Sequence, residues 1–277
     1  MEFKIHCHLV YQVIGSASFL FNVAPVRNSL QRVVTEDIKV TGAQPVEELM
    51  QTGQRLHRLD APNGRLELNY QTVISVEPEI LDANVLNVAP LHELPLEALV
   101  FLYPSRFCQS DLLARFANRE FTNIESGYER LTRICNWIYE YVEYLQGSTN
   151  SSTSAFDTAT QRAGVCRDFA HLGIALCRAL GIPARFVSGY AYGLNPPDFH
   201  AYFEAFLGGR WIIADPTRLS PQSSFVRIGQ GRDAADTSFA TIFGNVTLME
   251  MQLSNEMATA GSSPPLYADG PISNCSV

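Results

Sequence analysis

The sequence predicts an α+β protein in which a β-rich, sandwich-like N-terminal domain (residues 1–87) precedes a domain of mixed helices and strands (residues 105–254). Two observations predict this division. In the first part apolar and polar residues alternate, as they do from Leu66 to Ile74, which is typical of strands with one buried face. In the second part apolar residues recur at helical spacing, and strand-like segments follow them.

The expected N-terminal domain consists of several short strands. Residues 3–9 alternate in the same way as residues 66–74, and turn residues such as Gly15 and Gly42 recur between the apolar segments. Asn63-Gly64 is a dipeptide that favours a tight hairpin turn. Strands at this spacing predict a small sandwich or barrel.

A connector and a tail flank the second domain. Residues 88–104 contain Pro90, Pro95 and Pro104, which is typical of a connecting segment. Residues 255–277 are rich in Ser, Pro, Gly and Ala, so we expect a flexible tail there.

The second domain is expected to place a buried helix against several strands. Apolar residues cover most of one helix, which is therefore predicted to be central, and Gly181 followed by Pro183 is a suitable end for it. The expected helices are Ser110–Ala117, Glu125–Leu145 and Cys166–Leu180, and the expected strands are Ala184–Ala191, Phe199–Leu207 and Arg210–Ala214.

Composition excludes several classes of function. Hydrophobic residues make up 46% and charged residues 17% of the 277 residues, which is a normal globular mixture. The formal net charge of −8 is unfavourable for binding a nucleic-acid backbone. No apolar run reaches the ~20 residues needed to span a bilayer, and the N-terminus lacks the apolar segment of a signal peptide. We therefore expect a cytoplasmic protein with no nucleic-acid or membrane partner.

Six cysteines are too few for a disulfide scaffold, but one of them has a position that favours chemistry. Cys166 follows a Gly-containing loop and opens the buried helix. The unpaired N–H groups and the partial positive charge of a helix N-terminus favour thiolate over thiol, and the same N–H groups can stabilise an oxyanion. The alternative is a small buried core thiol, which is the better interpretation of a cysteine considered alone and of Cys177 near the end of the helix.

A histidine and an aspartate lie on the hairpin that follows. A turn at Gly208-Gly209 pairs Leu207 with Arg210, and the same register places His200 and Asp215 as diagonal neighbours on one face. At roughly 7–8 Å between backbones, the carboxylate can reach the imidazole. A three-residue turn would separate the two side chains, so this prediction depends on the length of the turn.

Other histidines favour structural interpretations, and no metal site is predicted. His6 and His8 share a strand face, but no nearby acidic or thiol ligand completes a metal set. His171 lies five residues after Cys166, about 140° around the helix, so a buried, hydrogen-bonded histidine is the preferred interpretation.

At these residues the chain resembles the transglutaminase-like superfamily, in the bacterial branch of transglutaminase-like enzymes and candidate cysteine proteases. The motifs are GVCRDFAHLGIALCRALGIPARFVSGY (164–190), HAYFEAFLGGRWIIADPT (200–217) and GQGRDAAD (229–236). The resemblance implies a papain-like catalytic core, in which the nucleophile opens a helix that packs on an antiparallel sheet. The first hundred residues resemble the N-terminal domain of this bacterial branch.

Carried over by motif, the resemblance implies a catalytic triad of Cys166 as nucleophile, His200 as general base and acid, and Asp215 as the residue that orients the imidazole. The implied activity is acyl transfer from peptide or isopeptide amides through a thioester, without a cofactor. Hydrolysis by a cysteine protease-like enzyme is slightly preferred. A transamidase of the protein-glutamine gamma-glutamyltransferase type, and a non-catalytic binding module, are the alternatives.

The expected partner is a peptide or protein substrate, and the oligomeric state stays open. Gln161 and Trp137 precede the nucleophile and are candidates for an oxyanion donor, although each is more often a loop or core residue. Asp168 is expected to order the helix start. Arg232 lies in the last of the three motifs, GQGRDAAD (229–236), which we call the closing motif. Two interpretations are open for it: a role at the rim of the site, or simple salt bridging.

Overall fold

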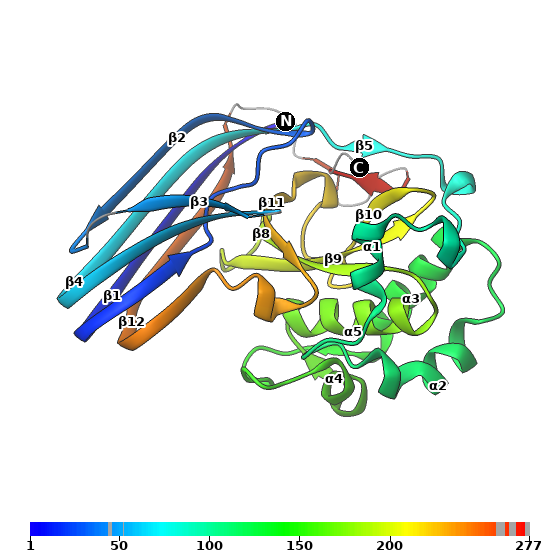
Figure 1. Ribbon diagram of the computed structural model, residues 1–277. Helices are drawn as coiled ribbons and strands as arrows, with labels where there is room; N and C mark the ends of the chain where they lie inside the picture. The colour runs from blue at the N-terminus through cyan, green and yellow to red at the C-terminus, as the bar shows by residue number, and fades with distance from the viewer. Residues whose placement is uncertain (44–45, 52, 259–263, 266–269, 275–277) are drawn as a thin grey trace.

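The computed structural model describes residues 1–43, 46–51, 53–258, 264–265 and 270–274 and confirms the α+β class (Figure 1). One large antiparallel sheet of nine strands runs through the molecule, with strand order β10-β9-β8-β11-β4-β1-β12 and with β2 and β3 also paired to β4. Its strands are β1 (Glu2–Phe21), β2 (Gln31–Thr41), β3 (Glu47–Gln51), β4 (Gln54–Val76), β8 (Ala184–Tyr190), β9 (Phe199–Leu207), β10 (Arg210–Ala214), β11 (Val226–Gly231) and β12 (Ala240–Met257).

The α-helices follow the first five strands in the sequence, and two small sheets complete the described part. The helices are α1 (Leu96–Leu99), α2 (Ser110–Phe121), α3 (Gly127–Tyr141), α4 (Ala155–Gln161) and α5 (Cys166–Ala179). The two-stranded sheets pair β5 (Glu79–Ile80) with β13 (Ile272–Ser273), and β6 (Glu143–Tyr144) with β7 (Ala163–Gly164). Within the described residues, no helix is long and apolar enough to cross a membrane.

The N-terminal β-rich domain forms two layers because its longest strands bend back on themselves. Tyr11 and Phe19 lie eight residues apart on β1, about 26 Å in a straight strand, yet their ring centroids are only 5.3 Å apart. Gly15, Gly64 and Gly244 lie near the bends of β1, β4 and β12, with φ angles of 83°, 134° and 149° that side chains disfavour. The apolar faces of the two layers enclose a core of their own.

Three expectations differ from the structure in this region. Asn63-Gly64 does not end a strand, because β4 continues through it and bends there. Residues 240–257 form β12, and this strand pairs with β1 of the N-terminal domain, although residues 240–254 were included in the domain expected at 105–254. Ile272 and Asn274 are buried, in contrast to the flexible tail expected at 255–277. Residues 259–263, 266–269 and 275–277 of that tail lie outside the described residues.

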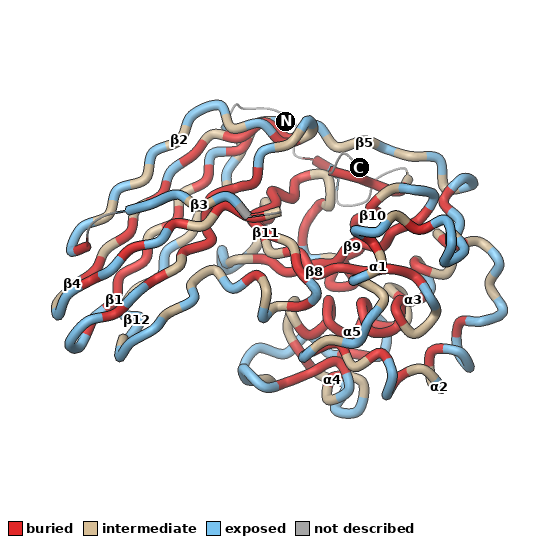
Figure 2. The backbone as a smooth tube through the Cα atoms, in the orientation of Figure 1, coloured by how far each residue is buried: buried red, intermediate tan, exposed pale blue. Residues whose placement is uncertain are grey.

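The second half is organised around α5, which is buried along most of its length as predicted (Figure 2). α5 packs on β8 and β9, and α2, α3 and α4 surround it. Gly173 permits the close approach, because a Cβ at this position would lie 2.3 Å from Cε1 of Phe203 on β9. The predicted bounds of β9 and β10 are confirmed, whereas α3 ends at Tyr141 instead of continuing to Leu145.

Candidate active site

Cys166 is the first residue of α5, as predicted, and its side chain lies at the wall of a cleft. The buried carboxylate of Asp168 orders this helix start. It accepts hydrogen bonds from the Val165 N–H at 3.0 Å and the Thr149 hydroxyl at 2.7 Å, and the Arg167 guanidinium also binds it. This anion at the positive end of the helix fixes the backbone that carries the thiol.

The hairpin register places the histidine and the aspartate together. β9 and β10 pair Leu207 with Arg210 and Phe203 with Ala214, which is the predicted register. Nε2 of His200 and Oδ2 of Asp215 lie 2.8 Å apart, and both residues are buried. Asp215 also accepts hydrogen bonds from the backbone N–H and the hydroxyl of Thr217, at 2.9 and 3.0 Å. The aspartate is thus held in place and orients the imidazole.

The partners of His200 favour its protonated form. Burial alone would lower its pKa, but the charge of Asp215, the hydrogen bond to it, and the hydrogen bond and charge interaction with Cys166 raise the pKa to about 10. Since Nε2 faces Asp215, the other ring nitrogen, Nδ1, is the atom available to Cys166. Histidine therefore links the thiol and the carboxylate, which is the arrangement that a cysteine nucleophile requires.

Tyr144 is a site residue that the sequence did not reveal. It was expected inside a helix, but α3 stops at Tyr141, and residues 143–144 form β6, which pairs with β7 beside the nucleophile. The Tyr144 side chain interacts with Cys166, and its ring centroid lies 5.7 Å from that of Phe169. Burial and the charge of Cys166 raise the pKa of Tyr144, so its hydroxyl remains a hydrogen-bond donor.

The cleft that exposes the candidate nucleophile has a volume of about 660 Å³ and is lined by both halves of the molecule. Cys166 and His200 line it together with residues 240–242 at the beginning of β12. The charged side chains among the described lining residues are Arg106 and Arg167, and no carboxylate is among them. The apolar lining consists of Phe107, Phe186, Phe199, Ala201, Ile228, Ala234, Ala235, Phe239, Ala240 and Ile242.

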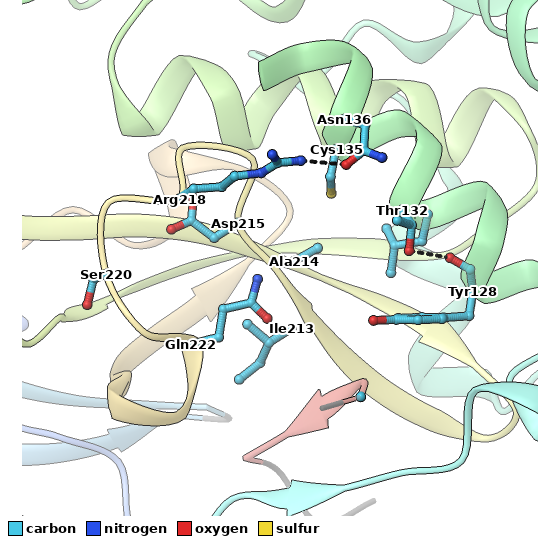
Figure 3. Close-up of a pocket in the computed structure, with 12 residues that line it drawn as sticks. Tyr128, Thr132, Cys135, Asn136, Ile213, Ala214, Asp215, Arg218, Ser220 and Gln222 are labelled. Carbon is cyan, nitrogen blue, oxygen red and sulfur yellow. Dashed lines mark hydrogen bonds between the residues drawn. The ribbon is translucent and has the colours of Figure 1, made fainter. Parts of the chain in front are cut away.

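A second, smaller cavity of about 290 Å³ lies behind Asp215, between α3 and β10 (Figure 3). Cys135 and Arg218 line it together with Asp215. Burial, followed by the charge of Asp215, raises the pKa of Cys135 to about 12, so this thiol stays protonated at neutral pH. No imidazole lines this cavity among the described residues. The larger cleft is therefore the candidate active site.

The two expected oxyanion donors do not line that cleft. Gln161 is exposed at the end of α4. Trp137 packs in α3 against Phe116, with ring centroids 5.0 Å apart, and the Arg162 guanidinium lies 4.4 Å from its ring. Both positions agree with the structural interpretations that were open for these residues.

The closing motif forms ion pairs and turn contacts. Arg232 is exposed, and its Nε lies 2.9 Å from Oδ2 of Asp236. Asp233 is buried and accepts hydrogen bonds from the N–H groups of Phe107 and Ala235, both at 3.0 Å. These contacts agree with salt bridging and anchor the segment that precedes β12.

The remaining histidine and cysteine expectations concern the core. His171 is fully buried, stacks on Phe107, and accepts a hydrogen bond from the Ala234 N–H at 3.1 Å. Burial lowers its pKa well below the ordinary value, so it is neutral. Cys177 is also buried, and burial raises its thiol pKa. Among the described residues, no group of three His, Cys, Asp or Glu side chains could hold a metal ion.

Two family models match successive parts of the chain. A family model described as "Bacterial transglutaminase, N-terminal domain" matches residues 1–97, and the model of the transglutaminase-like superfamily core matches residues 114–216. A crystal structure from Cytophaga hutchinsonii, named "Putative Cysteine Protease", is 46% identical with a TM-score of 0.94. The match covers 99% of this chain and 97% of that one.

Curated relatives come from mycobacteria. An uncharacterized protein of Mycobacterium leprae is 27% identical over 247 residues, which span 83% of this chain and 87% of that protein. An uncharacterized protein of Mycobacterium tuberculosis is 34% identical over 143 residues, which span 46% of this chain and 45% of that protein.

Proposed function

This chain belongs to the transglutaminase-like superfamily, and from that premise we propose that it is a cysteine-dependent acyl-transfer enzyme that acts on peptide or isopeptide amides, with hydrolysis preferred. The observation that carries the proposal is the position of the His200 imidazolium between the Cys166 thiol and the Asp215 carboxylate, at the wall of an open cleft. A thiolate–imidazolium pair is the reactive form of a cysteine nucleophile.

In the first step the Cys166 thiolate attacks the carbonyl carbon of the bound amide. A carbon–sulfur bond forms, and negative charge develops on the carbonyl oxygen. We assign the backbone N–H of Cys166, at the positive end of α5, the role of a donor to that oxygen. His200 then gives its proton to the leaving nitrogen, the carbon–nitrogen bond breaks, and a thioester remains.

In the second step water attacks the thioester. His200, now neutral, accepts a proton from the water, and the carbon–sulfur bond breaks to release the carboxylic acid and the cysteine. Asp215 holds the imidazole in one orientation through both proton transfers. An amine that replaced water would form a new amide instead, so the fate of the thioester distinguishes a hydrolase from a transamidase.

The first test is alkylation of Cys166 by iodoacetamide, located by mass spectrometry across pH 5–9 in wild type and in His200→Ala. We expect rapid labelling of Cys166 near pH 6 in the wild type and slow labelling in the variant, because the variant lacks the imidazolium. Cys135 supplies an internal control, since its thiol stays protonated. Equal labelling rates of Cys166 in the wild type and in His200→Ala would refute the proposal.

The second test concerns the products. A library of peptide amides is incubated with the enzyme in the presence and absence of a primary amine such as putrescine, and the products are identified from their masses by mass spectrometry. Release of carboxylic acids that the amine does not suppress supports hydrolysis. Quantitative incorporation of putrescine instead would identify a transamidase.

A further inference from the structure

The cleft is bordered by an open edge of the large sheet. β12 is the last strand in the sheet order and pairs with β1, and Figure 1 shows it as the outermost strand of its layer. Residues 240–242 of this strand line the cleft together with Cys166 and His200. The edge and the candidate nucleophile therefore face the same space.

The register shows which backbone groups point outward along this edge. The Asn22 N–H donates to the Phe239 carbonyl at 2.8 Å, so these two residues form a hydrogen-bonded pair. Hydrogen-bonded and non-hydrogen-bonded pairs alternate in an antiparallel ladder. Ala240, opposite Phe21, and Ile242, opposite Phe19, are thus in non-hydrogen-bonded pairs. Their N–H and C=O groups point away from β1, toward the open edge.

Beside the cleft, the edge lacks the charged residues and prolines that often prevent pairing with other chains. Natural edge strands carry charged residues, prolines or covering segments. β12 has neither a charged residue nor a proline between Ala240 and Met249, and its acidic residues, Glu250 and Glu256, lie in the distant half. No backbone hydrogen bond from Ala240 or Ile242 to a segment outside the sheet is present in the described part of the chain.

We propose that the substrate of this enzyme is an extended peptide that binds as an additional strand along residues 240–242 of β12, which delivers one of its carbonyl groups to Cys166. This proposal rests on the proposed function and specifies how the same site recognises its substrate. Backbone pairing supplies the affinity in such complexes, and side-chain pockets supply the selectivity. Here Phe107, Phe186 and Phe239 provide apolar surface for a side chain of the peptide.

The charge of the cleft adds to this description of the substrate. Arg106 lines the cleft with its guanidinium 5.0 Å from the Phe107 ring, and among the described residues no carboxylate lies within ion-pair distance of it. The rest of the described lining carries no carboxylate. An apolar peptide with an acidic residue near the scissile bond is therefore the preferred substrate, even though the chain as a whole is acidic.

The test uses acetyl-Ala-Ala-Phe chloromethyl ketone, with which the Cys166 thiolate forms a thioether and releases chloride. The measured quantity is the ratio of two rates of Cys166 alkylation, that by the chloromethyl ketone divided by that by iodoacetamide, which has no peptide backbone. We expect Ala240→Pro, which removes an outward N–H, to lower this ratio about three- to tenfold, the factor for one or two lost hydrogen bonds. N-methylation of the middle amide of the probe should lower it similarly in the wild type, without any change to the protein.

Met251→Pro is the matched control. The Ala258 N–H donates to the Glu2 carbonyl, so the same alternation makes the N–H of Met251 point outward, at a position that does not line the cleft. We expect the Met251→Pro ratio to equal that of the wild type. If neither Ala240→Pro nor the N-methylated probe changes the ratio, the inference is overturned. The proposed function stands in that case as long as iodoacetamide still labels Cys166 rapidly.

A second copy of the chain is the other occupant that an open edge could accept. A concentration-dependent dimer in sedimentation experiments, dissociated by Ala240→Pro and not by the peptide probe, would assign the edge to self-association and overturn the inference. Loss of iodoacetamide reactivity at Cys166 in the wild type would instead refute the proposed function.

Discussion

The substitution Asp215→Asn tests the electrostatics of the site. Asp215 is buried and its Oδ2 lies 2.8 Å from Nε2 of His200. Although burial opposes the charge, the partners of His200 raise its pKa from the ordinary 6.5 to about 10. This difference corresponds to on the order of 5 kcal/mol in favour of the imidazolium. Asparagine keeps the shape of the side chain and an oxygen that can accept the Thr217 N–H, but it removes the charge.

We expect alkylation of Cys166 by iodoacetamide at pH 6 to fall by about a hundredfold in Asp215→Asn. The estimate assumes that half of the free energy supports the thiolate, since each 1.36 kcal/mol corresponds to a factor of ten. The assay is the time course of carbamidomethylation at Cys166, measured by mass spectrometry between pH 5 and pH 9. Circular dichroism and thermal unfolding establish that the variant is folded.

Asp236→Asn is the control for loss of an ion-paired aspartate. Asp236 pairs with Arg232 and not with a histidine, so its substitution should leave the alkylation rate of Cys166 unchanged. Wild-type alkylation in Asp215→Asn at pH 6 would refute the reasoning that this carboxylate maintains the reactive pair. An equal loss in Asp236→Asn would show that the effect is a general consequence of altered charge.

Four further predictions concern activity and stability. Tyr144→Phe should lower kcat with little change in KM, measured on a peptide amide, because the interaction of the Tyr144 hydroxyl with Cys166 is lost. The pKa of His200 is raised on folding, so its contribution to stability is complete below about pH 6.5 and disappears as the pH rises through about 10; urea unfolding of wild type and His200→Gln should show a difference that shrinks over this range. Asp168→Ala should lower the free energy of unfolding by about 2–4 kcal/mol, because buried groups at the start of α5 lose their partner; unchanged urea unfolding would contradict this. Gly173→Ala should lower it by about 1–3 kcal/mol through overpacking against Phe203, and an unchanged Tm would show that the ring moves aside freely.

Much of the second half was predictable because its determinants are local. The bounds of β9 and β10 follow from one two-residue turn, and the turn also sets the register that brings His200 and Asp215 together. Cys166 opens α5 because a glycine-containing loop precedes a long apolar segment. Interactions within about twenty residues were sufficient in each case, so a pattern in the sequence carried the information.

Tyr144 was missed because the end of a helix is not a local property. Apolar residues continue at helical spacing to Leu145, but Val142 is extended, with φ −120° and ψ 123°, and the chain turns there to pair with β7. The end of this helix depends on packing against α5 and on hydrogen bonds from Glu143 and Leu145 to the carbonyls of Arg162 and Gly164, and sequence periodicity does not indicate either interaction. The same limit applies to Trp137, whose place in an aromatic cluster is set by α2.

The positions of the candidate catalytic groups were predictable from the sequence: a thiol at a helix start, and a histidine and an aspartate on one hairpin face. The tertiary structure decided the surroundings in which that chemistry acts. More than two hundred residues separate β1 from β12 in the sequence, yet the two strands pair. This pairing places the beginning of β12 in the lining of the cleft. The partner of a distant strand is selected by apolar surface buried over the whole domain, and by the positive-φ glycines that let long strands fold back. Those quantities exist only once the chain is folded.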